Sequence, residues 1–211
     1  MDQVFAVRQV CEKYLANGKD VFWAFMDLEK VYDTINRHGM WQMLRVYGVG
    51  GKLLKAVQSF YVHSRACVWV RNDVSEWFLV NVGIRQGCEM SPWFNIYIYM
   101  DGVVREVNLM VLGKGFELLS ANGGTFEINQ LLFADDTALV ADSEEKLCRL
   151  VSECGRVCER IKLRVNVGKS KVMRCSRYGN GDRMHVILNG EPFEEVYCFK
   201  CLGSQVAADG G

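Results

Sequence analysis

Several features are scarce in this sequence, and each scarcity excludes a class of protein. Its 211 residues include only two prolines and show no internal repeat, so neither a proline-rich disordered chain nor a repeat array fits. The apolar stretches 21–26 and 93–100 are too short to span a bilayer. The N-terminus lacks the basic segment and apolar core of a signal peptide. We therefore expect an intracellular globular protein with no membrane partner.

Cysteine is plentiful, but the nine cysteines do not form a disulfide framework, because their number is odd and their spacing irregular. Two pairs are close enough in sequence for a zinc site: Cys154 with Cys158, and Cys198 with Cys201. The first pair lies on an apolar helical stripe, where cysteine commonly serves as a small buried hydrophobe. A zinc-binding module is thus an alternative to a core role.

Charge is balanced over the whole chain but not along it. The 25 basic and 25 acidic residues give a net charge of zero, which by itself gives no sign of a polyanionic partner. Nine basic residues nevertheless lie between Arg156 and Arg183, against only Glu159 and Asp182. Such a segment either contacts nucleic-acid phosphates or forms a solvated helix face followed by a basic edge strand. Charge alone does not decide between the two.

Hydrophobic periodicity predicts an α/β (α+β) fold. Residues 21–26 are apolar on both alternating faces, which predicts a strand buried on both sides. Two further strands, 126–133 and 137–141, flank a tight turn, and the clearest helical spacing follows at 147–161. The remaining pattern predicts helices at 4–16, 38–47, 51–62 and 92–108, hairpins at 65–82 and 186–196, a glycine-rich loop at 109–124, and strands at 163–167 and 171–175.

This order of elements predicts one main domain. With an insertion at about 63–108 set aside, it is the β-α-β-β-α-β pattern of a ferredoxin-like sheet. We expect residues 1–178 to form this domain, and 179–211 to form a hairpin and the start of a connection. In this layout the first strand ends beside the turn of the central hairpin, so Asp27, Asp135 and Asp136 would meet at one edge of the sheet.

Three carboxylates in one place indicate a cation. Unfilled, they would repel one another. Hard oxygen ligands suit Mg²⁺, and two such ions stabilise the attacking and leaving oxygens when a nucleotide is transferred to a 3′-hydroxyl. An Asp-Asp pair alone is also common in turns, so this interpretation depends on the surrounding residues.

Five segments, in order along the chain, surround these carboxylates. Their sequences are FMDLEKVYD from Phe25, GIRQGC from Gly83 with Ser91-Pro92 after it, FADD from Phe133, NVGKSK from Asn166 and FKCLGS from Phe199. Together they resemble the motifs of reverse transcriptases of non-LTR (LINE-type) retrotransposons. The resemblance implies a polymerase palm with part of the fingers, and RNA-directed DNA polymerase activity.

The resemblance also implies roles for single residues at the metal site. Asp27 and Asp135 would be the main metal ligands, with Asp136 as a third carboxylate. The backbone carbonyl of Leu28 would face a metal as well. The cofactors would be two Mg²⁺ ions, or Mn²⁺ in their place.

Further roles concern the nucleotide and the primer. Tyr32 would lie under the incoming sugar and disfavour a 2′-hydroxyl, although a core tyrosine packed on the sheet is the alternative. The nucleotide-binding residues would also include Arg85, Gln86, and Lys169 or Lys171, between which the sequence does not choose. Leu202 and Gly203 would form the turn that holds the primer end.

The implied partners are an RNA template, a DNA primer and deoxynucleoside triphosphates. The family's enzymes carry a fingers segment before these motifs and a thumb after them, so we expect this chain to grip its substrates weakly. A folded, inactive remnant that at most binds nucleic acid is the alternative function. An RNA-copying RNA polymerase would share the fold, but the Arg85-Gln86-Gly87 loop and Tyr32 favour deoxynucleotides.

Overall fold

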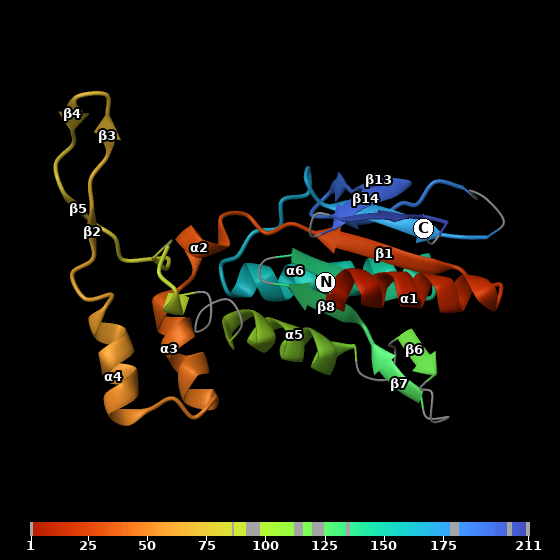
Figure 1. Ribbon diagram of the computed structural model, residues 1–211, viewed down its shortest axis with the longest axis horizontal. Helices are drawn as coiled ribbons and strands as arrows, with labels where there is room; N and C mark the ends of the chain where they lie inside the picture. Colours follow the sequence, from red (N-terminus) through yellow and green to blue (C-terminus); the bar gives the residue numbers. More distant parts are fainter. Residues whose placement is uncertain are drawn as a thin grey trace. The chain divides into compact units, whose positions relative to one another are not determined.

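The computed structural model describes residues 2–85, 87–91, 98–111, 116–119, 125–133, 136–177, 182–201 and 204–209 (Figure 1). The chain divides into two compact units. The sheet unit consists of Met1–Glu29, Val103–Arg160 and Arg164–Gly211, and the helical unit of Lys30–Gly102 and Ile161–Leu163. The domain boundary expected at residue 178 stays a prediction. Within the described residues no helix is both long and apolar enough to cross a membrane.

A five-stranded sheet in the order β13-β10-β1-β9-β8 forms the centre of the sheet unit. Its strands are β1 (Val21–Met26), β8 (Gln130–Phe133), β9 (Asp136–Ala141), β10 (Lys171–Cys175) and β13 (Glu194–Glu195). Helix α5 (Ile98–Met110) precedes β8 in the chain, and α6 (Glu144–Arg160) connects β9 to β10. Without β13, this is the ferredoxin-like order that the sequence predicted.

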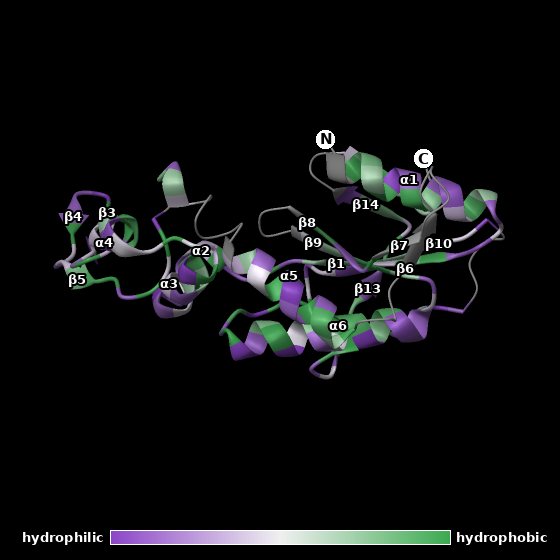
Figure 2. Ribbon diagram, turned by 90° about the horizontal axis from the view of Figure 1, so that it is seen from below, coloured by the Kyte–Doolittle hydropathy of each residue, from purple (hydrophilic) through white to green (hydrophobic). Residues whose placement is uncertain are grey.

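Strand β1 is buried along its whole length because helices cover both faces of the sheet (Figure 2). Helix α1 (Asp2–Ala16) lies on one face, and α5 and α6 lie on the other. Val21, Trp23 and Phe25 belong to the core cluster under α1. Since side chains alternate along a strand, the residues between them point to the opposite face. The prediction of a strand buried on both sides is confirmed.

Helix α1 follows the predicted spacing of apolar residues. Its buried side chains recur at intervals of one, three and four residues and pack on the sheet; they are Val4, Val7, Val10, Cys11 and Leu15. The helix stops where Gly18 adopts a positive φ of 67° and its N–H donates to the Leu15 carbonyl at 3.0 Å. The thiols of Cys11 and Cys175 meet in this core, with their Sγ atoms 3.3 Å apart.

Helix α6 confirms the clearest helical pattern in the sequence. Its buried residues lie on one face, and they are Leu147, Leu150, Val151, Cys154, Gly155, Val157 and Cys158. Cys154 and Cys158 therefore lie in the core of the sheet unit. At the start of the helix the Ser143 hydroxyl accepts a hydrogen bond from the N–H of Lys146 at 3.3 Å.

Three expectations about strands and loops were wrong in detail. The strand expected at 126–133 breaks at Asn129, so that β7 (Thr125–Ile128) pairs with β6 (Phe116–Leu119) while β8 pairs with β9. Residues 116–119, expected in a loop, form a strand because β7 supplies a partner that local glycine content does not predict. In the segment 163–167 only Val165 is paired, as a single bridge to Leu28.

The C-terminal part of the sheet unit contains two small hairpins. Strands β11 (Ile187–Leu188) and β12 (Glu191–Pro192) pair around Asn189 and Gly190, whose φ angles are 53° and 85°. Two positive φ values in a two-residue turn are typical of type I′, so the predicted hairpin is confirmed. Strand β14 (Cys198–Cys201) pairs with β15 (Ser204–Ala207).

The helical unit begins with three helices: α2 (Val31–Thr34), α3 (Arg37–Val46) and α4 (Gly51–Ser59). Asn36 caps α3, because its side-chain oxygen accepts hydrogen bonds from the N–H groups of His38 and Gly39. A long hairpin follows, and its short ladders are β2 (Arg65–Ala66) with β5 (Phe78–Leu79), and β3 (Trp69–Val70) with β4 (Asp73–Val74). The predicted hairpin is thus confirmed.

Arg37 of α3 forms hydrogen bonds with the end of this hairpin. Its guanidinium donates hydrogen bonds to the carbonyls of Gly83 and Val80, both at 2.7 Å, and of Val82 at 3.1 Å. It also lies over the Tyr61 ring, 5.0 Å from the ring centroid. One planar, five-donor group therefore holds the segment that enters the Gly83 turn.

Gly83 is required at this turn by both conformation and space. Its φ is 72°, and a Cβ there would lie 2.7 Å from the backbone oxygens of both Tyr32 and Asp33. Backbone atoms cannot move aside as a flexible side chain can. The turn therefore packs directly on the backbone of α2.

We predict that Gly83→Ala lowers the free energy of unfolding by at least about 2 kcal/mol, since strain and overpacking add together. The matched control is Gly48→Ala, at a φ of 82° with nothing within 4 Å of the new Cβ. It should cost only the conformational strain, about 1 kcal/mol. Urea unfolding of both variants measures this difference, and equal losses would contradict the packing argument.

For Arg37→Met we expect a loss of about 2 kcal/mol of unfolding free energy, because several carbonyls lose a charged donor. Arg37→Lys should recover less than half of this loss, since an ammonium cannot reproduce the planar fork. Thermal unfolding of the two variants tests the prediction. Full recovery by lysine would show that charge alone matters here.

Candidate active site

Strand pairing brings two of the predicted site residues to neighbouring positions in the sheet unit. Strands β1 and β9 are antiparallel, and Met26 pairs with Thr137. Asp27 directly follows Met26 and Asp136 directly precedes Thr137, so both aspartates adjoin the last pair of this register. Asp136 also pairs with Phe133 across the central hairpin. Asp135 lies outside the described residues, as does the Asp136 side chain.

The backbone of Asp27 is held by a turn at residues 166–170. Its N–H donates to the Ser170 hydroxyl at 3.1 Å, and its carbonyl accepts from the N–H of Asn166 at 2.8 Å. The half-exposed Asp27 side chain follows the last residue of β1, where the regular ladder ends. Two segments far apart in the sequence, each with a predicted motif, are therefore hydrogen-bonded to each other.

Leu28 forms an antiparallel bridge with Val165. The bonds of this bridge run from Asn166 N–H to the Asp27 carbonyl and from Glu29 N–H to the Arg164 carbonyl, both at 2.8 Å. In such a pair the central residues direct their own carbonyls away from the partner strand. The Leu28 carbonyl is thus left out of the ladder, which is compatible with the role expected for it.

The two candidate lysines differ in their surroundings. Lys171 lies in β10, where its ammonium donates to the Gly168 carbonyl at 3.0 Å and to the Glu194 carboxylate at 2.6 Å. This pairing lowers the pKa of the Glu194 carboxyl. Lys169 lies in the exposed turn, with no ion pair among the described residues. The structure thus separates two lysines that the sequence left equivalent.

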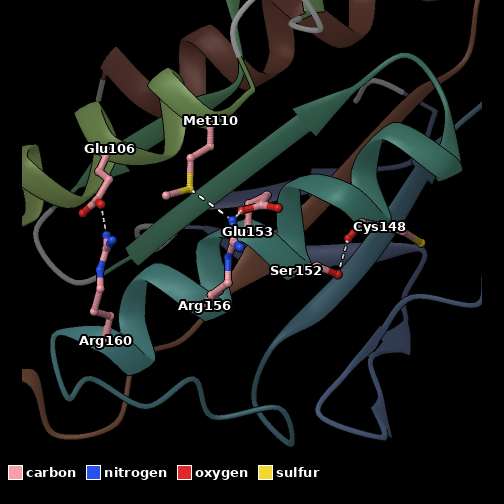
Figure 3. Close-up of polar contacts among 7 residues, drawn as sticks. All are labelled: Glu106, Met110, Cys148, Ser152, Glu153, Arg156 and Arg160. Carbon is pink, nitrogen blue, oxygen red and sulfur yellow. Dashed lines mark hydrogen bonds and ion pairs between the residues drawn. The ribbon is translucent and has the colours of Figure 1, made fainter.

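Much of the basic segment is engaged in structural ion pairs (Figure 3). Arg156 pairs with Glu153 and contacts the Met110 sulfur of α5 at 3.4 Å, and Arg160 pairs with Glu106 of α5. These arginines therefore tie α6 to α5, which favours the structural interpretation for the helical part of the segment. Arg174 likewise pairs with Asp20 at 2.7 Å. The exposed basic residues of the segment after α6 are Lys162, Arg164, Lys169, Arg177 and Arg183.

The helical unit brings together two of the residues expected at the nucleotide, Tyr32 and Arg85. Tyr32 lies half-buried in α2, and its carbonyl accepts a hydrogen bond from the N–H of Ile84 at 2.6 Å. The N–H of Gly83 donates to the Ile35 carbonyl at 2.9 Å. Arg85, which is exposed, directly follows this anchored pair. Tyr32 and the Arg85 loop are thus neighbours within this unit.

Other predicted positions lie outside the described residues: Gln86, Asp135, Leu202 and Gly203. Among the residues that are described, no three His, Cys, Asp or Glu side chains form a group that could hold a metal ion. The carboxylate cluster that the sequence predicts includes Asp135, so its side chains stay a prediction.

Sequence reasoning missed three residues that organise these segments. Arg37 holds the hairpin end that leads to the Arg85 loop. Ser170 and Asn166 hold the Asp27 backbone. A serine between two lysines indicates an exposed turn, and only the fold reveals that Ser170 is fully buried.

Comparisons with known proteins agree with the motifs. The chain is 28% identical over 130 residues to the Pol polyprotein of the type-1 retrotransposable element R2 of Nasonia vitripennis, covering 61% of this chain. It is 24% identical over 170 residues, or 80% of this chain, to the 149 kDa protein of transposon TX1 of Xenopus laevis. In both cases it spans 12% of the relative's length.

Solved structures share the fold at low identity. Candida albicans telomerase in complex with a fragment of telomeric RNA matches 98% of this chain with a TM-score of 0.68 and 13% identity; the chain covers 33% of it. Apo telomerase of Candida tropicalis, truncated from the C-terminal domain, matches 99% with a TM-score of 0.66 and 12% identity; 38% of that protein is covered. At these identities the likeness concerns the fold alone.

The family comparison covers almost the whole chain. The model of the family described as reverse transcriptase (RNA-dependent DNA polymerase) matches residues 2–206. The relatives come from elements of the non-LTR type that the five motifs predicted. The chain therefore belongs to the reverse transcriptase (RNA-dependent DNA polymerase) family, as a fragment of a non-LTR retrotransposon enzyme.

Proposed function

We propose that this chain is the part of a reverse transcriptase that transfers deoxynucleotides to a primer 3′-hydroxyl under the direction of an RNA template. One observation carries the proposal: the β1–β9 register ends with the pair of Met26 and Thr137, which Asp27 and Asp136 directly adjoin in the chain. This register aligns the first and third family motifs at one edge of the sheet. The motifs belong to a family whose reaction needs carboxylates at that edge.

The residues at this edge fit divalent cations of the hard type. Asp27, Asp135 and Asp136 offer only carboxylate oxygens, which suit Mg²⁺ or Mn²⁺ better than softer metals. The Leu28 carbonyl, outside its ladder, adds a further hard donor. When bound at these groups, two such ions would stabilise the attacking and the leaving oxygen of the transfer.

The other site residues of the proposal position the substrates. Tyr32 would support the incoming sugar and disfavour a 2′-hydroxyl, and Arg85 with Gln86 would contact the nucleotide phosphates and the template. Leu202 and Gly203 would hold the primer end. Tyr32 and Arg85 come from segments that hydrogen-bond to each other, which supports their working on the same nucleotide.

Lys169, rather than Lys171, is the lysine that we assign to the triphosphate. A general acid must reach the leaving group, so it has to be free of structural partners. Lys171 is tied to Glu194 and Gly168, whereas Lys169 projects from the exposed turn next to Asp27's own anchor. In this role Lys169 would give a proton to the departing pyrophosphate.

The competing function is a folded remnant without activity that at most binds nucleic acid. The chain spans 12% of the length of each curated relative, so substrate contacts made elsewhere in those proteins are not represented. A folded wild-type chain that fails to extend any primer would favour the remnant.

We predict Mg²⁺-dependent extension of a DNA primer on an RNA template by the purified chain. Asp27→Asn and Asp135→Asn should each lower the rate by roughly 100-fold or more, because each removes a charge that stabilises the transition state. The control is Asp142→Asn, which removes a surface carboxylate paired with Lys146 in the same unit. Its rate should stay within about two-fold, since exposed pairs contribute little. Equal loss in all three variants would contradict the assignment.

A second comparison separates the two lysines. Lys169→Met should lower kcat by roughly 100-fold, the size of a general-acid contribution. Lys171→Met and Glu194→Gln both break the ion pair, and we expect each to lower kcat by less than about ten-fold while reducing stability slightly. Single-turnover extension together with urea unfolding checks both effects. The reverse order of kcat losses would assign the triphosphate to Lys171.

A further inference from the structure

Ser170 is a polar residue in a place where core packing does not need one. Its side chain is 0% exposed, although it lies in a turn between two lysines. Its hydroxyl accepts the N–H of Asp27 at 3.1 Å and donates to the Asn166 carbonyl at 2.8 Å. A buried hydroxyl with both a donor and an acceptor partner is fully satisfied and has a defined orientation.

The hydroxyl replaces a missing strand partner. The β1–β10 ladder ends with the pair of Phe25 and Lys171, so Asp27 lies two residues beyond the last residue of β1 that is paired with β10. The carbonyl of Asp27 is bonded to the N–H of Asn166 at 2.8 Å, in the same turn. Residues 166–170 therefore hold both backbone groups of Asp27. The Ser170 side chain accepts from its N–H, and the Asn166 N–H donates to its carbonyl.

The same turn is closed by its own hydrogen bonds. The Asn166 carbonyl accepts from the N–H of Ser170 at 2.9 Å and from the N–H of Lys169 at 3.2 Å. Lys171 donates to the Gly168 carbonyl, which adds a tie from β10. Asp27 and Lys169 are thus attached to one small rigid element, with Ser170 as the link between them.

We propose that Ser170 is a positioning residue, which sets the Asp27 carboxylate for cation binding and couples it to the Lys169 turn. This inference rests on the proposed function. Ser170 touches neither substrate nor cation; it acts through the backbone of Asp27. Because misplacement of a reacting group by about 1 Å costs roughly 100-fold, loss of this single hydroxyl should be visible in both cation affinity and rate.

The test compares Ser170→Ala, Ser170→Thr and Ser143→Ala. Ser143 is the matched control, because its hydroxyl also accepts a backbone N–H in the sheet unit but at the start of α6, in the helix that follows β9. Electron paramagnetic resonance measures Mn²⁺ binding in the absence of substrate. The part of the binding signal that is lost in Asp27→Asn is assigned to the proposed site. Hydrogen exchange of the Asp27 amide is measured in parallel.

For Ser170→Ala we expect Mn²⁺ affinity to fall by roughly ten-fold or more and the Asp27 amide to exchange faster. Ser170→Thr keeps the hydroxyl and should stay within about three-fold of wild type, and Ser143→Ala should leave Mn²⁺ affinity unchanged even where it lowers stability. Unchanged affinity and exchange in Ser170→Ala would overturn the inference, as would Mn²⁺ binding that does not depend on Asp27.

The outcome for the proposed function is read separately. If the wild type extends a primer and Ser170→Ala keeps the Mn²⁺ affinity and Asp27 amide exchange of the wild type, the polymerase function is supported and the positioning role is contradicted. A wild-type chain that binds Mn²⁺ through Asp27, and loses affinity in Ser170→Ala, but extends no primer would support the positioning role while contradicting the polymerase.

Discussion

The pairing of β1 with β9 is the constraint on which the rest of the sheet unit depends. It runs through five residue pairs, from Phe22 with Ala141 to Met26 with Thr137. Because β1 is buried on both faces, a slip of one residue would exchange its two sets of side chains between α1 and the opposite helices. The core therefore fixes the register, and the register fixes which residues follow the strands at their edge. Asp27 and Asp136 adjoin the last pair of the register as a consequence.

The turn at 166–170 adds a second, more local constraint on the same edge. A strand end normally loses order where its ladder stops, yet the Asp27 backbone has partners on both sides of its peptide units. These partners come from a segment that follows α6, so the packing of α6 on the sheet indirectly supports the edge. Precision at the candidate site thus derives from both the core and a few buried hydrogen bonds.

The relatives indicate which of these features are general to the fold. Telomerase structures share the fold of almost the whole chain at only 12–13% identity, so most side chains can change while the topology persists.

In the helical unit, Arg37 and Gly83 play a comparable role to the Asp27 anchor. One donates to several carbonyls, and the other allows backbone to pack on backbone, so that the Arg85 loop starts from a fixed point.

The sequence alone determined the elements with strong periodicity, because burial on one face or two leaves a direct pattern in the residues. Strand β1, helix α6 and the ferredoxin-like order were predictable on this basis, whereas the five motifs were identified by their resemblance to a family. Non-local pairing was not predictable: β6 forms because β7 lies beside it, and the segment 163–167 forms only one bridge, to Leu28. Likewise, only the tertiary structure distinguished Lys169 from Lys171, and only the tertiary structure showed that Ser170 is buried. Both findings depend on hydrogen-bond partners far away in the chain. Local residue types record burial and turn preference, whereas the identity of a distant hydrogen-bond partner is decided by the fold.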